Sequence, residues 1–299
     1  MSNEISTAFY DVMFGNEEKK SFLNNVEQQT LSNVREVLNS LEKLSSKIPP
    51  LPLVLVELVN ILKEPKADFL DFVKIIEKDP SLALEILKVA NTAKYKRTDK
   101  SIDSLRQAVG LLGVTGVAKI ASTIVLKEIM PQKPIYHKMF GKQIWEHSLY
   151  CASMCQILAS TNNEDLFEAH FLGLIHDVGK ILIFNCLCEA FSSAEIDSKP
   201  GGSAFKKLMS EMSVDISYYI ALEWQLPTIY VEALRQQRTK QKSNLAKILF
   251  NANLLSEVYL LYQHNIADDE QVEDLLSRLS LDEEIWQAFI DQTKEIMAA

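Results

Sequence analysis

The sequence places a histidine beside an aspartate inside an apolar segment, GLIHDVGK at residues 173–180. An imidazole and a carboxylate on adjacent residues can converge on one divalent ion, because the helix backbone fixes their directions. Another histidine, His147, lies upstream in a second segment with helical periodicity. Two histidines and one carboxylate are a common ligand set for transition metals. The residues therefore predict a partial metal site at His147, His176 and Asp177, with a hydrogen-bonded interior histidine as the equal alternative for His147.

The elements that position these residues are predicted to be helices. Apolar residues recur along nearly the whole chain at a spacing of about 3.6 residues, the period of an amphipathic helix. The chain has only 9 glycines, which argues against the tight turns of β-hairpins. The fold class predicted is all-α, and the helices expected around the candidate site are residues 137–160, 164–177, 179–192, 203–225, 227–237 and 243–264.

Local signals mark where several helices begin and end. Asp68 and Asp79 are predicted N-caps, and Pro80 occupies the favoured first position after the second of them. Gly113 suits a left-handed residue at a helix end. Pro131 and Pro134 interrupt the helical pattern. We therefore place a boundary between two lobes at residues 130–140.

The charge of the chain is concentrated near its C-terminal end. The formal net charge is −9, and residues 256–299 alone carry eleven acidic against two basic side chains, a balance of −9. Clustered phosphate-binding cations are missing from this segment, which argues against nucleic-acid binding by it. A solvated helical face explains the acidic tail better than an acidic docking surface does. A capping box of Ser280 with Glu283 is predicted within it.

The cysteines and the hydropathy pattern bear on location. The four cysteines are Cys151, Cys155, Cys186 and Cys188; their spacing is unusual for a zinc site, and small buried apolar side chains explain them better. The pattern shows no basic, then apolar, leader and no uninterrupted apolar stretch of about 18 residues. These features predict a soluble, cytoplasmic protein with reduced thiols and no membrane contact.

Several motifs in order along residues 47–255 resemble the HDOD family, the HD-related output domains of bacterial signalling proteins. The motifs are IPPLP at 48–52, DPSLA at 79–83, LKVANTA at 87–93, AVGLLG at 108–113, WEHS at 145–148, the stretch 171–180 and WQLP at 224–227. The resemblance implies an all-α, two-lobed fold, with an N-terminal helical lobe (47–135) and an HD-like lobe (136–255). Residues 1–46 would then be a helical extension and residues 256–299 an acidic helical tail.

The resemblance also implies where catalytic relatives hold their metals, and this chain departs from that pattern. At the corresponding positions it has Ser213, Gln236 or Gln237, and Asn253. Neutral hydroxyl and amide groups bind divalent transition metals poorly. Lys180 is interpreted as a cation that covers the helix end with its stem.

These departures favour a non-catalytic signal-transduction module that binds a partner protein or a small ligand, with a groove between the lobes as the expected place. No sensory, receiver or cyclase pattern is seen, so a stand-alone regulator is expected. No cofactor is expected; weak binding of manganese, iron, nickel or zinc is left open. The alternative is a residual metal-dependent phosphohydrolase, a phosphodiesterase that uses His147, His176 and Asp177. The residues leave the oligomeric state open.

Overall fold

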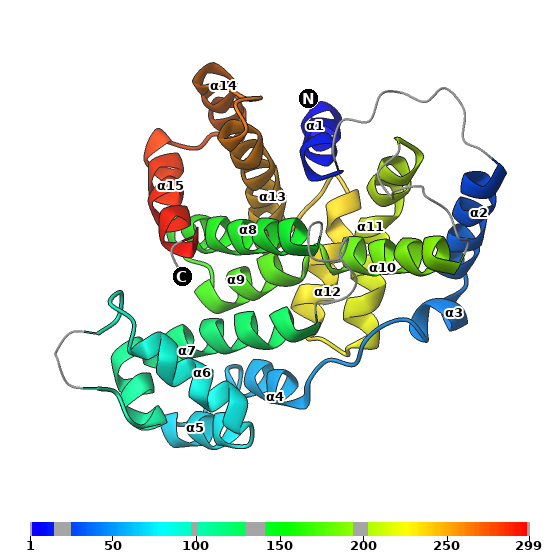
Figure 1. Cartoon of the computed structure of the whole chain (residues 1–299). Helices are drawn as coiled ribbons and strands as arrows, with labels where there is room; N and C mark the ends of the chain where they lie inside the picture. Colours follow the sequence, from blue (N-terminus) through cyan, green and yellow to red (C-terminus); the bar gives the residue numbers. More distant parts are fainter. Residues whose placement is uncertain (1, 15–24, 97–100, 130–140, 194–202, 298–299) are drawn as a thin grey trace. The chain divides into compact units, whose positions relative to one another are not determined.

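The computed structural model describes residues 2–14, 25–96, 101–129, 141–193 and 203–297, and every regular element within these ranges is a helix (Figure 1). The all-α prediction is confirmed. The chain forms two compact units: Pro49–Met130 is one, and Met1–Ile48 together with Pro131–Ala299 is the other. The predicted lobe boundary at residues 130–140 lies outside the described residues. The division into extension, domain and tail stays a prediction.

The smaller unit contains α4 (Leu53–Ile61), α5 (Phe69–Glu77), α6 (Pro80–Ala90) and α7 (Leu105–Ile129). The predicted caps are confirmed: a carboxylate oxygen of Asp68 accepts hydrogen bonds from the first turn of α5, and Asp79 does the same for α6. Gly113 has φ +73° and kinks α7. Glycine adopts this backbone conformation with little strain, which explains why glycine stands at the kink.

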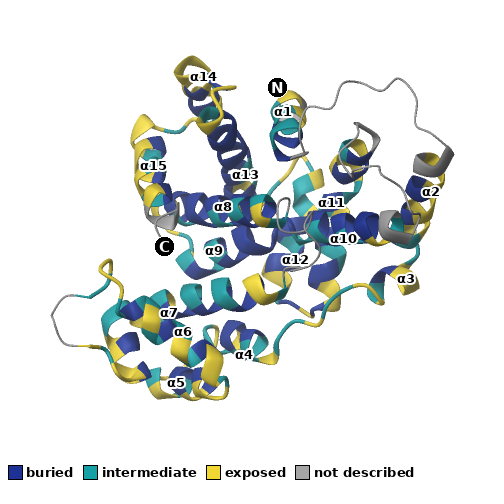
Figure 2. Ribbon diagram, in the orientation of Figure 1, coloured by how far each residue is buried: buried dark blue, intermediate teal, exposed yellow. Residues whose placement is uncertain are grey.

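The larger unit is built around α8 (Lys142–Thr161), which is buried along most of its length (Figure 2). It packs against α9 (Leu166–Ile175), α13 (Asn244–Gln263) and α15 (Glu283–Met297). Next to this core, α10 (Val178–Ser193) packs on α11 (Ser203–Glu223) and on α2 (Asn25–Asn39). The remaining helices are α1 (Ser2–Phe14), α3 (Leu41–Ser45), α12 (Thr228–Arg235) and α14 (Asp269–Leu279).

The acidic C-terminal helices pack through apolar faces, with Val272, Leu275, Trp286 and Phe289 buried. The predicted capping box of Ser280 with Glu283 is wrong. Ser280 has φ +56° and ends α14 as a left-handed residue, whereas an N-cap needs extended backbone. The capping box in this region is formed instead by Asp268 and Gln271 at the start of α14.

Two apolar segments are long enough to cross a bilayer by length and composition, Leu105–Ile129 and Leu166–Ala190. Less than half of the first is buried in the structure, whereas most of the second is. The second is interrupted by His176 and Asp177, at the junction of α9 and α10. It is therefore accounted for as a core element of the larger unit.

Candidate functional site

Two glycines set the position of the histidine–aspartate pair at the junction of α9 and α10. A Cβ at Gly173 would lie 2.5 Å from the Cα of Ala152, so α9 can approach α8 only with glycine there. A Cβ at Gly179 would lie 2.2 Å from the carbonyl oxygen of Ser213, so α10 approaches α11 equally closely. The backbone N–H of Gly179 also donates to the Ser217 hydroxyl at 2.9 Å. The glycines of the motif thus bring four helices, α8, α9, α10 and α11, together around the pair.

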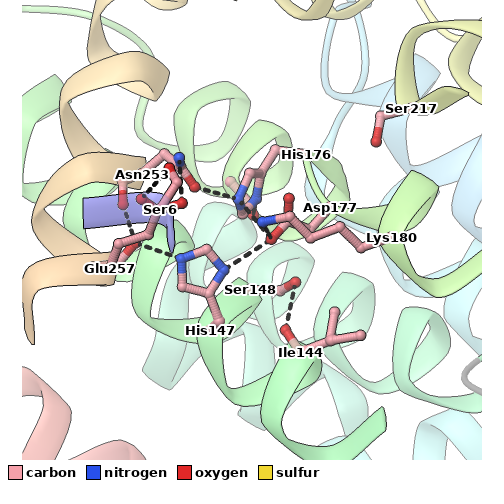
Figure 3. Close-up of polar contacts among 12 residues, drawn as sticks. Ser6, Ile144, His147, Ser148, His176, Asp177, Lys180, Ser217, Asn253 and Glu257 are labelled. Atoms are coloured by element: carbon pink, nitrogen blue, oxygen red, sulfur yellow. Dashed lines mark hydrogen bonds and ion pairs between the residues drawn. The ribbon is translucent and has the colours of Figure 1, made fainter. Parts of the chain in front are cut away.

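The three predicted ligand residues meet at one carboxylate oxygen. Oδ2 of Asp177 lies 2.8 Å from Nδ1 of His147 and 3.2 Å from Nε2 of His176. The ammonium of Lys180 lies 2.7 Å from the same oxygen. All four side chains are buried, and Figure 3 shows them pointing toward one another. Among the described residues, His147, His176 and Asp177 are also the only group of three or more His, Cys, Asp or Glu side chains arranged to hold a metal ion.

A second wall of the site comes from α13. Oδ1 of Asn253 lies 2.9 Å from Nε2 of His176, and the Ser256 hydroxyl lies 3.1 Å from Nε2 of His147. The amide of Asn253 also donates to Glu257 at 3.2 Å. Glu257 is only 2% exposed. The site therefore contains two buried carboxylates and one buried ammonium.

Burial and mutual contacts shift the proton affinities of these groups. Burial opposes the charge on Asp177, but His176, Lys180 and the hydrogen bond from His147 outweigh it and hold its pKa well below the usual range. Burial also opposes the charge on Lys180, and Asp177, Tyr10 and Glu257 together raise its pKa. Burial lowers the pKa of His147 to about 4, which leaves it neutral. Burial raises the pKa of Glu257. Asp177 and Lys180 are thus a buried, charged ion pair.

The hydrogen bonds of His176 indicate its protonation state. Its Nδ1 lies 2.7 Å from the carbonyl oxygen of Gly173, so Nδ1 carries a proton and donates it. Its Nε2 faces two oxygens, those of Asp177 and Asn253. Burial lowers the pKa of His176, but Asp177 and Cys151 outweigh burial and raise it well above its ordinary value. Both ring nitrogens of His176 thus face oxygen acceptors, an environment that favours the protonated ring.

The comparisons with known proteins place the chain in a family. The sequence profile of the HDOD domain matches residues 48–240, about two thirds of the chain. The chain belongs to the HDOD domain family. Its fold resembles that of an HDOD domain protein of unknown function from Geobacter sulfurreducens (TM-score 0.55, 18% identity, 79% of each chain covered). It also resembles a Shewanella amazonensis protein provisionally named a metal-dependent phosphohydrolase (TM-score 0.62, 20% identity, 89% of this chain and 99% of the other covered).

Two further proteins match in sequence over part of their length. An uncharacterised protein of Treponema pallidum is 20% identical over 215 residues, which cover 71% of this chain and 41% of the relative. The cyclic di-GMP phosphodiesterase CdgJ of Vibrio cholerae is 27% identical over 123 residues, covering 41% of this chain and 26% of that protein. The matches thus span less than half the length of either relative.

The departures from the metal-binding pattern fall in three different places. Asn253 lies in the site, beside His176. Ser213 is buried and its side chain bonds to Tyr10 of α1. Gln236 accepts from the backbone N–H of Ser243 at 2.6 Å, and Gln237 donates to two backbone carbonyls. The two glutamines therefore tie the end of α12 to the start of α13.

In this arrangement a metal ion would have to compete with Lys180 for Asp177. The ligand atoms of His147, His176 and Asp177 are close enough together to hold an ion, but the Lys180 ammonium lies 2.7 Å from Oδ2 of Asp177, and each histidine would have to present a lone pair to the ion. His176 would also have to lose a proton to become a ligand. In this structure the charge of Asp177 is balanced by an internal cation, Lys180. The prediction that Lys180 covers the helix end is wrong, because its ammonium is buried against Asp177.

Sequence reasoning missed Glu257 and the residues of α1. Glu257 was assigned to the solvated acidic tail, which is wrong for this residue because it is buried. Its signal was available: it is the only acidic residue in the apolar run of 245–262, one helical turn after Asn253. Nothing local in residues 2–14 indicates the site, since their contacts with it are formed only by long-range packing.

Proposed function

We propose that this HDOD protein is a non-catalytic signal-transduction module that binds a partner protein or a small ligand in the cytoplasm. One observation carries the proposal: the Lys180 ammonium, 2.7 Å from Asp177, engages the carboxylate oxygen that a metal would need. We further propose that no resident cofactor is held, and that manganese, iron, nickel or zinc binds weakly.

The chemistry of hydrolysis supports this reading. Metal-assisted cleavage of a phosphodiester needs an activated water and positive charge at the phosphate. The one buried ammonium of the site is neutralised by Asp177, and His176 is fixed by hydrogen bonds on both nitrogens. Asn253 is a neutral amide and adds no negative charge to hold a metal.

A residual metal-dependent phosphohydrolase is the second candidate. The convergence of His147, His176 and Asp177 favours it, and the relative from Vibrio cholerae is named a cyclic di-GMP phosphodiesterase. The match covers 26% of that protein. We therefore propose phosphodiesterase activity for this chain only as the second candidate.

Metal content and turnover distinguish the two candidates. The purified protein is analysed for bound metals and then assayed for hydrolysis of bis(para-nitrophenyl) phosphate with added manganese or nickel. We expect no stoichiometric metal and no turnover above that of the His176→Ala variant. Stoichiometric metal, together with turnover that His176→Ala and Asp177→Ala abolish, would establish the phosphohydrolase instead.

A further inference from the structure

The N-terminal helix α1 (Ser2–Phe14) lies on the candidate site although it is outside the matched family region, residues 48–240. It belongs to the larger unit, and it packs on α13 and on α11 (Figure 1). Glu257 lies on α13 and Ser213 lies on α11. Helix α1 therefore packs on two helices that line the candidate site.

One face of α1 is buried against the charged groups of the site. Phe9, Tyr10 and Met13 are 0%, 5% and 3% exposed. The ring of Phe9 lies 4.6 Å from that of His147, centroid to centroid, and the Lys180 ammonium lies 5.0 Å from the Phe9 ring centroid. The same ammonium lies 5.5 Å from the ring of Tyr10. An ammonium over aromatic faces is attracted by their negative potential, more strongly when it is shielded from water.

Polar contacts fix the register of α1 on this surface. The Ser6 hydroxyl donates to the second carboxylate oxygen of Glu257 at 3.0 Å (Figure 3). Asp11 pairs with Lys206 of α11 at 2.6 Å. Ser6, Phe9, Tyr10 and Met13 stand at positions i, i+3, i+4 and i+7. This is the spacing by which an amphipathic helix docks into a groove of another protein.

The helix depends on this docking for its structure. An isolated helix shorter than about 12–15 residues is marginal in water, and α1 has 13. It is joined to α2 through residues 15–24. A segment tethered over so short a distance competes at an effective concentration on the order of millimolar. A free helix must therefore bind well to displace it.

We propose that the surface formed by His147, Lys180, Ser213 and Glu257 is a helix-docking site that α1 occupies within the same chain. A partner helix with a hydroxyl residue followed three and four positions later by two aromatic residues would displace α1 and dock in its place. This deepens the proposed function, on which it rests, by naming the kind of partner and the contact that regulates its access.

A peptide of residues 1–15 with a fluorescent label at its C-terminus tests the proposal by anisotropy. It is titrated into the full-length wild type and into the full-length Phe9→Ala/Tyr10→Ala variant, whose own helix has lost its anchors. Because truncating aromatic anchors costs about 30-fold or more in affinity, we expect the variant to bind the peptide at least that much more tightly than the wild type. Thr7→Ser, which keeps the hydroxyl on the exposed face of α1, should behave as the wild type.

The peptide that itself carries both alanines should not bind either protein. If the variant is folded by circular dichroism and thermal melting, yet does not bind the unmodified peptide, the proposal is overturned. If the variant does not fold, hydrogen exchange of the wild type decides. The amides of α1 should then exchange through local opening, well before those of α8; equal protection of the two helices overturns the proposal. Phosphodiester turnover would refute the proposed non-catalytic role without changing any of these outcomes.

Discussion

The two units of this protein have cores of opposite character. In the unit Pro49–Met130, Ser122 is the only buried polar or charged side chain among the described residues. The larger unit buries two histidines, two carboxylates and an ammonium around a single point, in addition to several hydroxyl groups. Both units are helical and both begin their helices with the same kinds of caps.

The buried charged groups show that the fold of the larger unit is specified by polar interactions as well as by apolar packing. Burying a charge is costly unless it is paired and hydrogen-bonded. In the larger unit the ion pair between Lys180 and Asp177 offsets this cost. The described residues of the smaller unit have no buried charged side chain. The four predictions below test this contrast, from the largest expected effect to the smallest.

Removing the carboxylate of the buried pair should cost the most. Asp177→Ala leaves the Lys180 ammonium buried without its partner, and we expect a loss of about 3–5 kcal/mol in the free energy of unfolding. Urea denaturation measures it. The double variant Asp177→Ala/Lys180→Met should regain much of this loss, since the unpaired charge is gone. Glu85→Ala in the exposed pair with Lys88 of the smaller unit is the control and should change little. A loss under about 1 kcal/mol for Asp177→Ala would contradict the paired-charge account.

In the smaller unit the large effects should come from apolar side chains alone. Leu58 is fully buried, so Leu58→Ala should lower the free energy of unfolding by about 2–5 kcal/mol. Because no titratable side chain is buried among the described residues of this unit, the loss should be the same at pH 5 and pH 8. Leu53→Ala, at a position 71% exposed, should have little effect. A loss for Leu58→Ala that varies with pH would show that the two cores are less distinct than described.

Removing the internal cation should open Asp177 to a metal. Lys180→Met keeps an apolar stem of similar length but frees the carboxylate oxygen, so nickel should bind about 10–100-fold more tightly than to the wild type, as for the loss of one charged hydrogen bond. Isothermal titration calorimetry measures the affinity. Lys207→Met, at an exposed lysine on α11, should bind nickel as the wild type does. Equal affinity in Lys180→Met and wild type would mean that Lys180 does not compete with metals.

The buried carboxyl group of Glu257 should make the free energy of unfolding depend on pH. Burial raises the pKa of Glu257, so the folded protein holds the proton of this group more tightly than the unfolded chain does. The resulting contribution to stability is fully present below the unfolded pKa of about 4.3. That contribution is lost as the pH rises through the folded pKa. The Glu257→Gln side chain is neutral at every pH. As the pH rises from 5 to 8, the free energy of unfolding of the wild type should therefore fall relative to that of the variant. Urea denaturation across this range checks the sign, with exposed Glu270→Gln as the control. A difference that shrinks with rising pH would contradict the assignment.

The parts of this account that the sequence could predict are those set by local chemistry. Asp68, Asp79 and Gly113 act on their own helix ends, so residue type and neighbours were sufficient. His147, His176 and Asp177 could be predicted because two histidines and a carboxylate on apolar helices form a common ligand set, and the surrounding motifs resemble those of a known family. The orientation of Lys180 was not predicted, because a lysine near a helix end covers exposed carbonyls far more often than it is buried. Phe9 reaches the site only through the packing of α1, which no local pattern encodes, whereas Glu257 stands out in the sequence as the only acidic residue of the apolar run 245–262.

The central claim is that Lys180, and not a metal ion, neutralises Asp177. A crystal structure from protein soaked in manganese, with data collected where manganese scatters anomalously, tests it most directly. We predict no anomalous peak beside Asp177 and the Lys180 ammonium within hydrogen-bond distance of the carboxylate. A strong peak bonded to His147, His176 and Asp177, with Lys180 turned away, would contradict the account.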